Sequence, residues 1–160
     1  MPRGGCRDGG LSGARAANAL RTCSGDGSSS WAEMAAGADV LGICITTAEA
    51  VQKLALGPDG LLSHMREGAV FLDHTTVSPD HVDRMREACA ALNIAYCEAP
   101  MTRTPVHADR GEVNILFGGS EDLLERLRPL FETYAENIFH VGPAGHAIRS
   151  GPRSQPPSSV

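Results

Sequence analysis

The fold of this chain is decided by one stretch, AVFLDHTTVSPD, which spans residues 69–80. It begins with four apolar residues, as expected of a strand that is covered on both faces, and it turns polar at Asp73. Ser78 then offers an N-cap side chain, Pro79 stands at the first helical position, and Asp80 places negative charge in the first turn. The stretch therefore predicts a buried strand, a polar loop and a helix in direct succession.

The segments on either side repeat this order of strand, loop and helix. Further apolar runs predict strands at residues 39–45, 94–97, 113–117 and 138–141. Helices are predicted from capping boxes at Ser30 and Thr46, in a short segment ending at Arg66, over residues 105–110, and from Ser120 onward. Strands that alternate with helices at this spacing predict an α/β fold, a Rossmann-like, doubly wound and mostly parallel sheet.

Two of these helices have a predicted apolar face. The periodicity places on the buried side Val82, Met85, Ala88, Cys89 and Leu92 in the helix after Ser78, and Leu123, Leu127, Leu130 and Phe131 in the helix after Ser120.

Composition divides the chain into three parts. Residues 1–30 are rich in glycine, serine and arginine without apolar periodicity, so we expect a flexible leader, or alternatively an organelle transit peptide. Residues 31–149 carry the α/β pattern. Residues 150–160, SGPRSQPPSSV, are rich in proline and serine and are expected to form a disordered tail.

Charge and cysteine content narrow the classes of function. The net charge is −5 and the basic residues form no stripe, so we expect no nucleic-acid partner. The longest apolar run, Val40–Ile45, is too short to span a membrane. Five cysteines form no CxxC pair and six histidines form no HExxH motif, so we expect buried thiols, no metal site and a cytoplasmic location.

Polar or glycine-rich loops follow four of the predicted strands. They begin at Thr46, Asp73, Glu98 and Gly142. Ligands of open α/β sheets bind outside the carboxyl ends of the strands, so we expect a binding site among these loops. Taken singly, Thr46 is also explained as a helix cap.

Together, these loops resemble the superfamily of 3-hydroxyisobutyrate and 6-phosphogluconate dehydrogenases, over about residues 32–148. The matching motifs are ADV at 38–40, DHTTVSP at 73–79, EAPMTRT at 98–104, and the set Ala108, Gly111, Val113, Gly118 and Gly119. The resemblance implies an NAD(P)-binding domain of a β-hydroxyacid dehydrogenase. It implies NAD or NADP as cofactor and a small anionic hydroxyacid as substrate.

The resemblance also implies cofactor-binding residues. Ile45 and Thr46 would line the cofactor, and Thr76 would approach the nicotinamide ribose. His74 is expected to be a loop residue and not a catalytic base.

Substrate-binding residues are implied in the loop at 102–104. Thr102 would hydrogen-bond the substrate, and Arg103 stands where the family usually has glycine, next to Thr104. The Arg103 guanidinium would clamp an anionic group of the substrate, or it would be a solvated loop arginine.

The first half of the family's fold is not evident in the sequence. Gly9–Gly13 echoes the glycine-rich fingerprint, but no apolar strand precedes it, and the interval from Asn18 to Trp31 is too short for two more strands. We therefore expect an incomplete sheet. The apolar edge of Val40–Ile45 would then lack its neighbour, which predicts self-association through that strand.

The family's catalytic lysine falls at Gly151 in this chain. Lys53, the only lysine, lies on an early helix, so no catalytic residue is assigned. General acid–base catalysis is typically worth about 100- to 10,000-fold in rate. Since the family's helical domain is not recognisable either, we expect a truncated, catalytically deficient member. The alternatives are a non-catalytic α/β binding module and a non-functional gene fragment.

Overall fold

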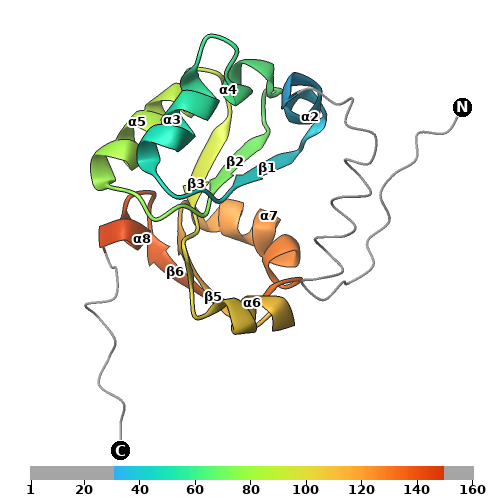
Figure 1. Ribbon diagram of the computed structural model, residues 1–160, viewed down its shortest axis with the longest axis vertical. Coiled ribbons are helices and arrows are strands. Elements are labelled where there is room, and N and C mark those ends of the chain that lie inside the picture. The colour runs from blue at the N-terminus through green and yellow to red at the C-terminus, as the bar shows by residue number, and fades with distance from the viewer. Residues whose placement is uncertain (1–30, 150–160) are drawn as a thin grey trace, which may run out of the picture.

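A computed structural model describes residues 31–149, in which a six-stranded sheet carries helices on both faces (Figure 1). The expected leader (1–30) and tail (150–160) lie outside the described residues. The strands are β1 (Val40–Ile43), β2 (Val70–Asp73), β3 (Ala95–Glu98), β4 (Met101–Thr102), β5 (Val113–Gly118) and β6 (Ala135–Gly142). The helices are α2 (Trp31–Gly37), α3 (Ala48–Leu56), α4 (Leu61–His64), α5 (Pro79–Ala90), α6 (Pro105–Arg110), α7 (Glu121–Phe131) and α8 (His146–Arg149).

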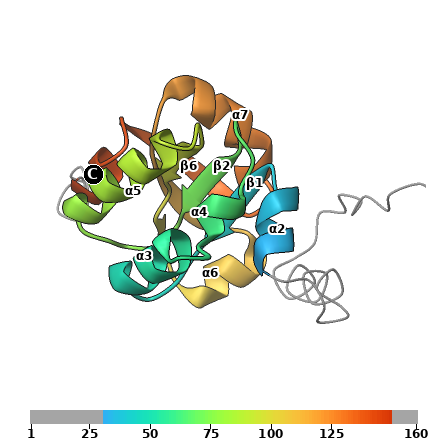
Figure 2. The same cartoon turned by 90° about the horizontal axis from the view of Figure 1, so that it is seen from above.

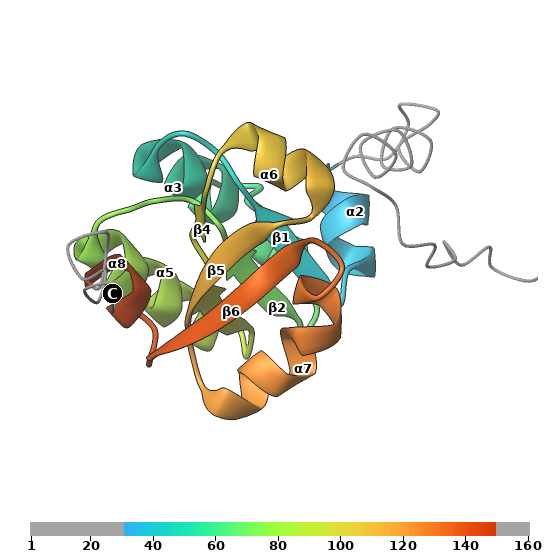
Figure 3. The same ribbon diagram turned by 90° about the horizontal axis from the view of Figure 1, so that it is seen from below.

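The sheet is mostly parallel, as predicted. β1, β2 and β3 run parallel in register, with Ile43 opposite Asp73 and Asp73 opposite Glu98. β6 pairs in parallel with β5, at the end of the sheet away from β1 (Figure 3). In the described part of the chain, β1 pairs only with β2 and is therefore an edge strand.

The direction of β5 is a feature that the sequence did not reveal. β5 runs antiparallel to β3 and to β4, a short strand that was not predicted. The chain between β4 and β5, residues 103–112, holds only α6 and a turn at Gly111, whose φ is 72°. A parallel crossover needs a dozen or more residues, so this short connection favours an antiparallel return.

Two hydrophobic cores lie on opposite faces of the sheet. Successive side chains of a strand point to opposite faces, so Phe71 joins the core beneath α3, α4 and α5, whereas Val70 and Leu72 join the core beneath α7. All four residues of β2 are buried. β2 is thus covered on both faces, which explains why its sequence is apolar up to Asp73. Figure 2 shows α3, α4 and α5 together over one face.

The helix starts confirm two of the predicted caps and correct one. The side chains of Ser78 and Ser120 accept hydrogen bonds from the backbone N–H groups of His81 and Leu123. Thr46 is not a cap: Thr47 takes that position and accepts from Ala50 N–H. Thr47 is the last extended residue before α3, so the predicted capping box was one residue out of register.

The apolar faces of α5 and α7 are also partly corrected. Leu92 lies beyond the end of α5 and is 44% exposed, while His81 is buried in the same helix. In α7, Leu124 is buried and Leu130 is 39% exposed. The buried residues Leu124, Leu127 and Phe131 keep the i, i+3, i+7 spacing of one helical face.

The cysteines differ from the expectation of buried thiols at one position. Cys89 and Cys97 are buried, and burial raises the pKa of Cys89 to about 12, so its thiol stays protonated. Cys44 is exposed, because it follows the end of β1 and stands in the loop. Cys6 and Cys23 lie outside the described residues. Within residues 31–149, no helix has the length and hydropathy required to cross a bilayer.

Candidate functional site

Three loops leave the carboxyl ends of β1, β2 and β3 at the same edge of the sheet. His74 N–H donates to Ile43 O over 2.8 Å, and Ala99 N–H donates to Asp73 O over 2.7 Å. The loop that contains Thr75 and Thr76 therefore begins next to the chain that leads into residues 99–104. This is the edge at which an open α/β sheet binds its ligands.

The three residues predicted to bind the cofactor lie in the first two of these loops. Ile45 is half-buried, while Thr46 and Thr76 are exposed. The two loops are joined through Thr75, which is buried and whose Oγ1 accepts a hydrogen bond from Ile45 N–H over 3.3 Å. Thr46 and Thr76 thus stand open to a ligand on loops that their own neighbours hold together.

Asp73 anchors the second loop through the hydrogen bonds of its side chain. Its carboxylate is fully buried, and Oδ1 accepts from Thr75 N–H over 2.8 Å. Oδ2 lies 3.2 Å from His81 Nε2 and accepts a longer hydrogen bond from the Tyr96 hydroxyl, over 3.4 Å. Sequence analysis placed Asp73 at the end of a strand and at the start of the DHTTVSP motif, without assigning it a role. A charged residue at the last position of a buried strand was the available signal for an anchoring role.

His74 fastens the second loop to two other segments. Its Nδ1 lies 2.6 Å from Ala99 O, and its Nε2 lies 3.2 Å from the Tyr134 hydroxyl. Burial lowers the pKa of His74, partly offset by the hydrogen bond to Ala99 and the charge of Asp73. The neutral ring donates from Nδ1 and accepts at Nε2, which suits both partners. This arrangement gives His74 the role of a cross-link between loops.

The third loop places Arg103 differently from either expectation. The Arg103 guanidinium forms an ion pair with the Glu136 carboxylate and donates to Glu112 O over 2.9 Å. It is therefore neither a free clamp nor a simply solvated arginine. Thr102 and Thr104 are exposed on either side, and the Thr104 hydroxyl lies 2.8 Å from His107 Nδ1.

Glu98, at the end of β3, holds the loop that follows β6. Its buried Oε1 accepts from Gly145 N–H over 2.9 Å and from Ala147 N–H over 2.7 Å. The Glu98 side chain lies so close to Gly118 that a Cβ on residue 118 would collide with it. The first letter of the EAPMTRT motif is thus a structural anchor for residues 142–147, a role that sequence reasoning missed.

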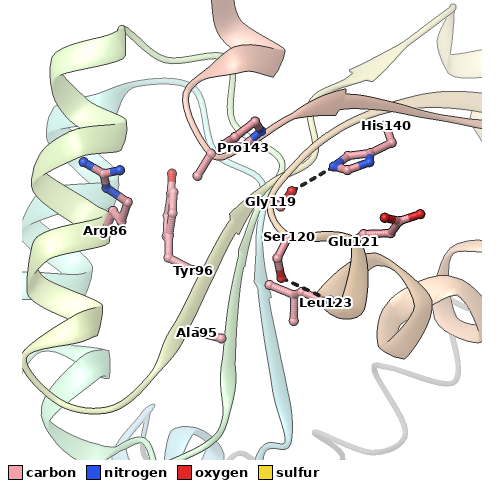
Figure 4. Close-up of a pocket in the computed structure, with 10 residues that line it drawn as sticks. Arg86, Ala95, Tyr96, Gly119, Ser120, Glu121, Leu123, His140 and Pro143 are labelled. Carbon is pink, nitrogen blue, oxygen red and sulfur yellow. Dashed lines mark hydrogen bonds between the residues drawn. The ribbon is translucent and has the colours of Figure 1, made fainter.

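A pocket of about 510 Å³ lies between α5, the start of α7 and the loop after β6, which is one of the four loops among which a binding site was predicted (Figure 4). Its lining includes Arg86, Tyr96, His140 and Pro143, and none of the predicted cofactor or substrate residues. His140 Nε2 lies 2.8 Å from Gly119 O, so that ring is engaged with the backbone. In residues 31–149, no three histidine, cysteine or acidic side chains are grouped as metal ligands would be.

The mostly parallel sheet, its two helical layers and the polar loops at one edge define a Rossmann-like α/β domain. The chain belongs to the family of the NAD-binding domain of 6-phosphogluconate dehydrogenase, which it matches over residues 12–142. The predicted superfamily is thereby confirmed, and so is NAD or NADP as the cofactor at the level of the family. The match begins inside the segment that was expected to be a leader.

Proteins similar to this chain include two dehydrogenases. The NAD-dependent L-serine dehydrogenase of Pseudomonas aeruginosa is 35% identical over 109 residues, which cover 68% of this chain and 37% of that protein. The structure of 3-hydroxyisobutyrate dehydrogenase with L-serine from Mycobacterium tuberculosis is 27% identical with a TM-score of 0.70, covering 74% of this chain and 40% of that one.

A second similar structure is that of a complex with a cofactor. Psf3 in complex with NADP⁺ and 2-OPP is 26% identical with a TM-score of 0.74, covering 86% of this chain and 48% of that one. This chain therefore spans less than half the length of each of these relatives.

Proposed function

We propose that this chain holds the nicotinamide end of NAD or NADP at the carboxyl edge of β1, β2 and β3. The observation that carries the proposal is that Thr46 and Thr76 are exposed on two loops that are held by buried groups. Thr75 accepts a hydrogen bond from Ile45 N–H, and Asp73 accepts one from Thr75 N–H. The residues present fit this half of the cofactor. A nicotinamide bound there supplies hydride transfer, and the chain's own residues supply its orientation.

A small anionic hydroxyacid is the proposed substrate class, and it would bind at residues 102–104. Thr102 and Thr104 are both exposed, with the Thr104 hydroxyl next to His107 Nδ1, and the names of two similar proteins include L-serine. For Arg103 to bind the substrate, its guanidinium has to exchange the Glu136 carboxylate for that of the ligand. Substrate affinity is therefore expected to be lower than that of a site with a free arginine.

Catalytic deficiency is part of the proposal. The position matched to the family's lysine is Gly151, which lies outside the described residues, and His74 is engaged at both ring nitrogens. Arg149, two residues before this position in the sequence, does not substitute for the lysine, since a guanidinium stays protonated. Introducing the amine with Gly151→Lys is expected to raise any NAD(P)-dependent oxidation of L-serine by about tenfold or more. Cofactor absorbance at 340 nm would measure this change.

Cofactor binding itself is tested by calorimetry on the full chain. NAD and NADP are titrated separately, and Thr76→Val is expected to weaken binding by about fivefold, the equivalent of one lost hydrogen bond. Glu125→Gln, on the exposed surface of α7, is the matched control and should bind as the wild type does. Absence of any dinucleotide binding would favour the second candidate, a non-catalytic binding module, to which the engaged state of Arg103 also points.

A further inference from the structure

A chain of hydrogen-bonded side chains runs from the surface of α3 and α5 to the anchor below the second loop. Arg84 Nη1 donates to Gln52 Oε1 over 3.1 Å. Gln52 Nε2 lies 3.0 Å from His81 Nδ1, and His81 Nε2 lies 3.2 Å from Asp73 Oδ2. The outer bond, between Arg84 and Gln52, is exposed, while His81 and Asp73 are buried.

The chemistry of the four groups sets the direction of every bond in this chain. A guanidinium only donates, so the Gln52 oxygen faces Arg84 and the Gln52 amide N–H faces His81. His81 Nδ1 must then accept, which leaves the ring proton on Nε2, where it donates to the Asp73 carboxylate. Each donor meets an acceptor. Turning the Gln52 amide alone, or moving the His81 proton alone, would place two donors opposite each other.

This series of hydrogen bonds ends at the loops that carry the proposed cofactor residues. Asp73 uses its second oxygen, Oδ1, to accept from Thr75 N–H, and Thr75 Oγ1 accepts from Ile45 N–H. The Asp73 carboxylate thus helps to position the loops after β1 and β2, together with the contacts of His74. The orientation of that carboxylate is set by His81, because a hydrogen-bonded network of this kind is rigid only when every member is satisfied.

We propose that Asp73 and His81 are positioning residues: their directed hydrogen bonds hold Thr75, and through it Ile45, at the spacing that the nicotinamide end of the cofactor requires. The positioning of the loops stands on the geometry alone. Only its consequence for cofactor affinity rests on the proposed function.

The variant Asp73→Asn tests the direction of these hydrogen bonds. The new amide keeps the shape of the carboxylate but must turn an N–H either toward Thr75 N–H or toward His81 Nε2–H. Switching the His81 proton to Nδ1 offers no escape, because Gln52 would then have to present its oxygen to His81 and its N–H groups to Arg84. We expect this variant to lose about tenfold in dinucleotide affinity and to melt at a lower temperature.

A second substitution should reverse the direction of the hydrogen bonds at His81 and restore a donor and an acceptor for each bond. In the double variant Asp73→Asn with Gln52→Glu, the carboxylate introduced at position 52 accepts both from Arg84 and from His81 Nδ1–H. His81 Nε2 then accepts from the amide introduced at position 73, whose oxygen is free to accept from Thr75 N–H. We expect the double variant to recover both the melting temperature and at least half of the lost affinity, although it differs from the wild type at one more position than Asp73→Asn.

Nitrogen-15 NMR of the imidazole provides a readout that a purely structural role would not move. The wild type should show the His81 proton on Nε2, and the double variant should show it on Nδ1. A wild-type proton on Nδ1, a wild-type affinity in Asp73→Asn, or a double variant no better than Asp73→Asn would each overturn the proposal. If Asp73→Asn does not fold, recovery of folding in the double variant supports it and continued unfolding overturns it.

The two proposals fail in different ways. If the wild type binds neither NAD nor NADP, the proposed function fails, whereas the His81 proton position and the melting temperatures still decide the role of Asp73 and His81. Glu125→Gln again serves as the surface control, with wild-type values expected in every measurement.

Discussion

Arg103 has a backbone conformation that side chains seldom adopt, with a φ of 90°. The left-handed region costs a non-glycine residue about 1–2 kcal/mol. The conformation persists because the guanidinium is engaged by Glu136 and by Glu112 O, which hold it against β6 and the turn before β5. At this position a single residue combines local strain with an ion pair that competes with the proposed substrate.

Arg103→Gly is expected to leave stability unchanged or to raise it by up to about 1 kcal/mol. Glycine removes the strain, and the lost ion pair is partly exposed, a kind worth about 0–1 kcal/mol. Thermal melts of Arg103→Gly and of Glu136→Gln, which loses the ion pair but keeps the strain, separate the two effects. A clear drop for Arg103→Gly would show that the ion pair outweighs the strain.

His74 gives the fold a dependence on pH. Its pKa in the folded chain is lowered by burial, so the unfolded chain takes up the proton first as the pH falls. Its contribution to stability is therefore complete above the ordinary histidine range near pH 6.5 and is lost as the pH falls below it. Urea unfolding from pH 8 to pH 5 should show this loss, and His74→Asn should flatten the profile. An equal slope in the variant would assign the effect to other groups.

Individual elements differ in how much of them the sequence predicts. Five strands and the caps at Ser78 and Ser120 follow from local patterns, because an apolar run and a helix start depend on neighbouring residues. The direction of β5 and the existence of β4 depend on pairing between distant segments, which no local pattern carries. The start of α3 was misplaced by one residue because Thr46 and Thr47 offer the same side chain.

The two adjacent threonines before α3 provide a matched comparison. Thr47→Ala is expected to destabilise the fold by about 1 kcal/mol, since it removes the cap on Ala50 N–H. Thr46→Ala should cost only a few tenths, because no cap is lost. Chemical denaturation of both variants measures the difference, and a larger loss for Thr46→Ala would contradict the observed register.

The candidate site was predictable as a set of loops but not as a set of partners. The loops were predicted from the strands that precede them, and the resemblance to the dehydrogenase superfamily singled out Thr46, Thr76 and Thr102 within them. The groups that hold these loops come from elsewhere in the chain: Gln52 and His81 are 29 residues apart, and Glu98 and Gly145 are 47 apart. Such contacts arise only when the sheet brings the segments together.

At the scale of the whole molecule, the described sheet ends at β1, which pairs with β2 alone. Gly42 is exposed on this strand, and a Cβ added there would meet nothing within 4 Å. Nearby α2 presents Trp31, which is 65% exposed, and Met34, which is 48% exposed. An edge that has no second partner among residues 31–149, beside exposed apolar side chains, favours contact with another chain.

We therefore expect the full chain to self-associate, and Val40→Lys to weaken that association by about tenfold, since a lysine on an edge strand opposes pairing. Sedimentation velocity over a range of concentrations measures the equilibrium. Leu130→Lys, on the exposed side of α7, is the control for added charge. A monomeric wild type at high concentration would contradict the expectation.

The contact between Glu98 and Gly118 has a consequence for the course of the chain after β6. The bare backbone at residue 118 leaves room for the carboxylate that receives the N–H groups of Gly145 and Ala147. A methyl group there would push the acid aside and release both amides at once. The direction in which the chain leaves β6 thus depends on the glycine at position 118 of β5, and Gly118→Ala is expected to shift α8 by displacing the Glu98 carboxylate.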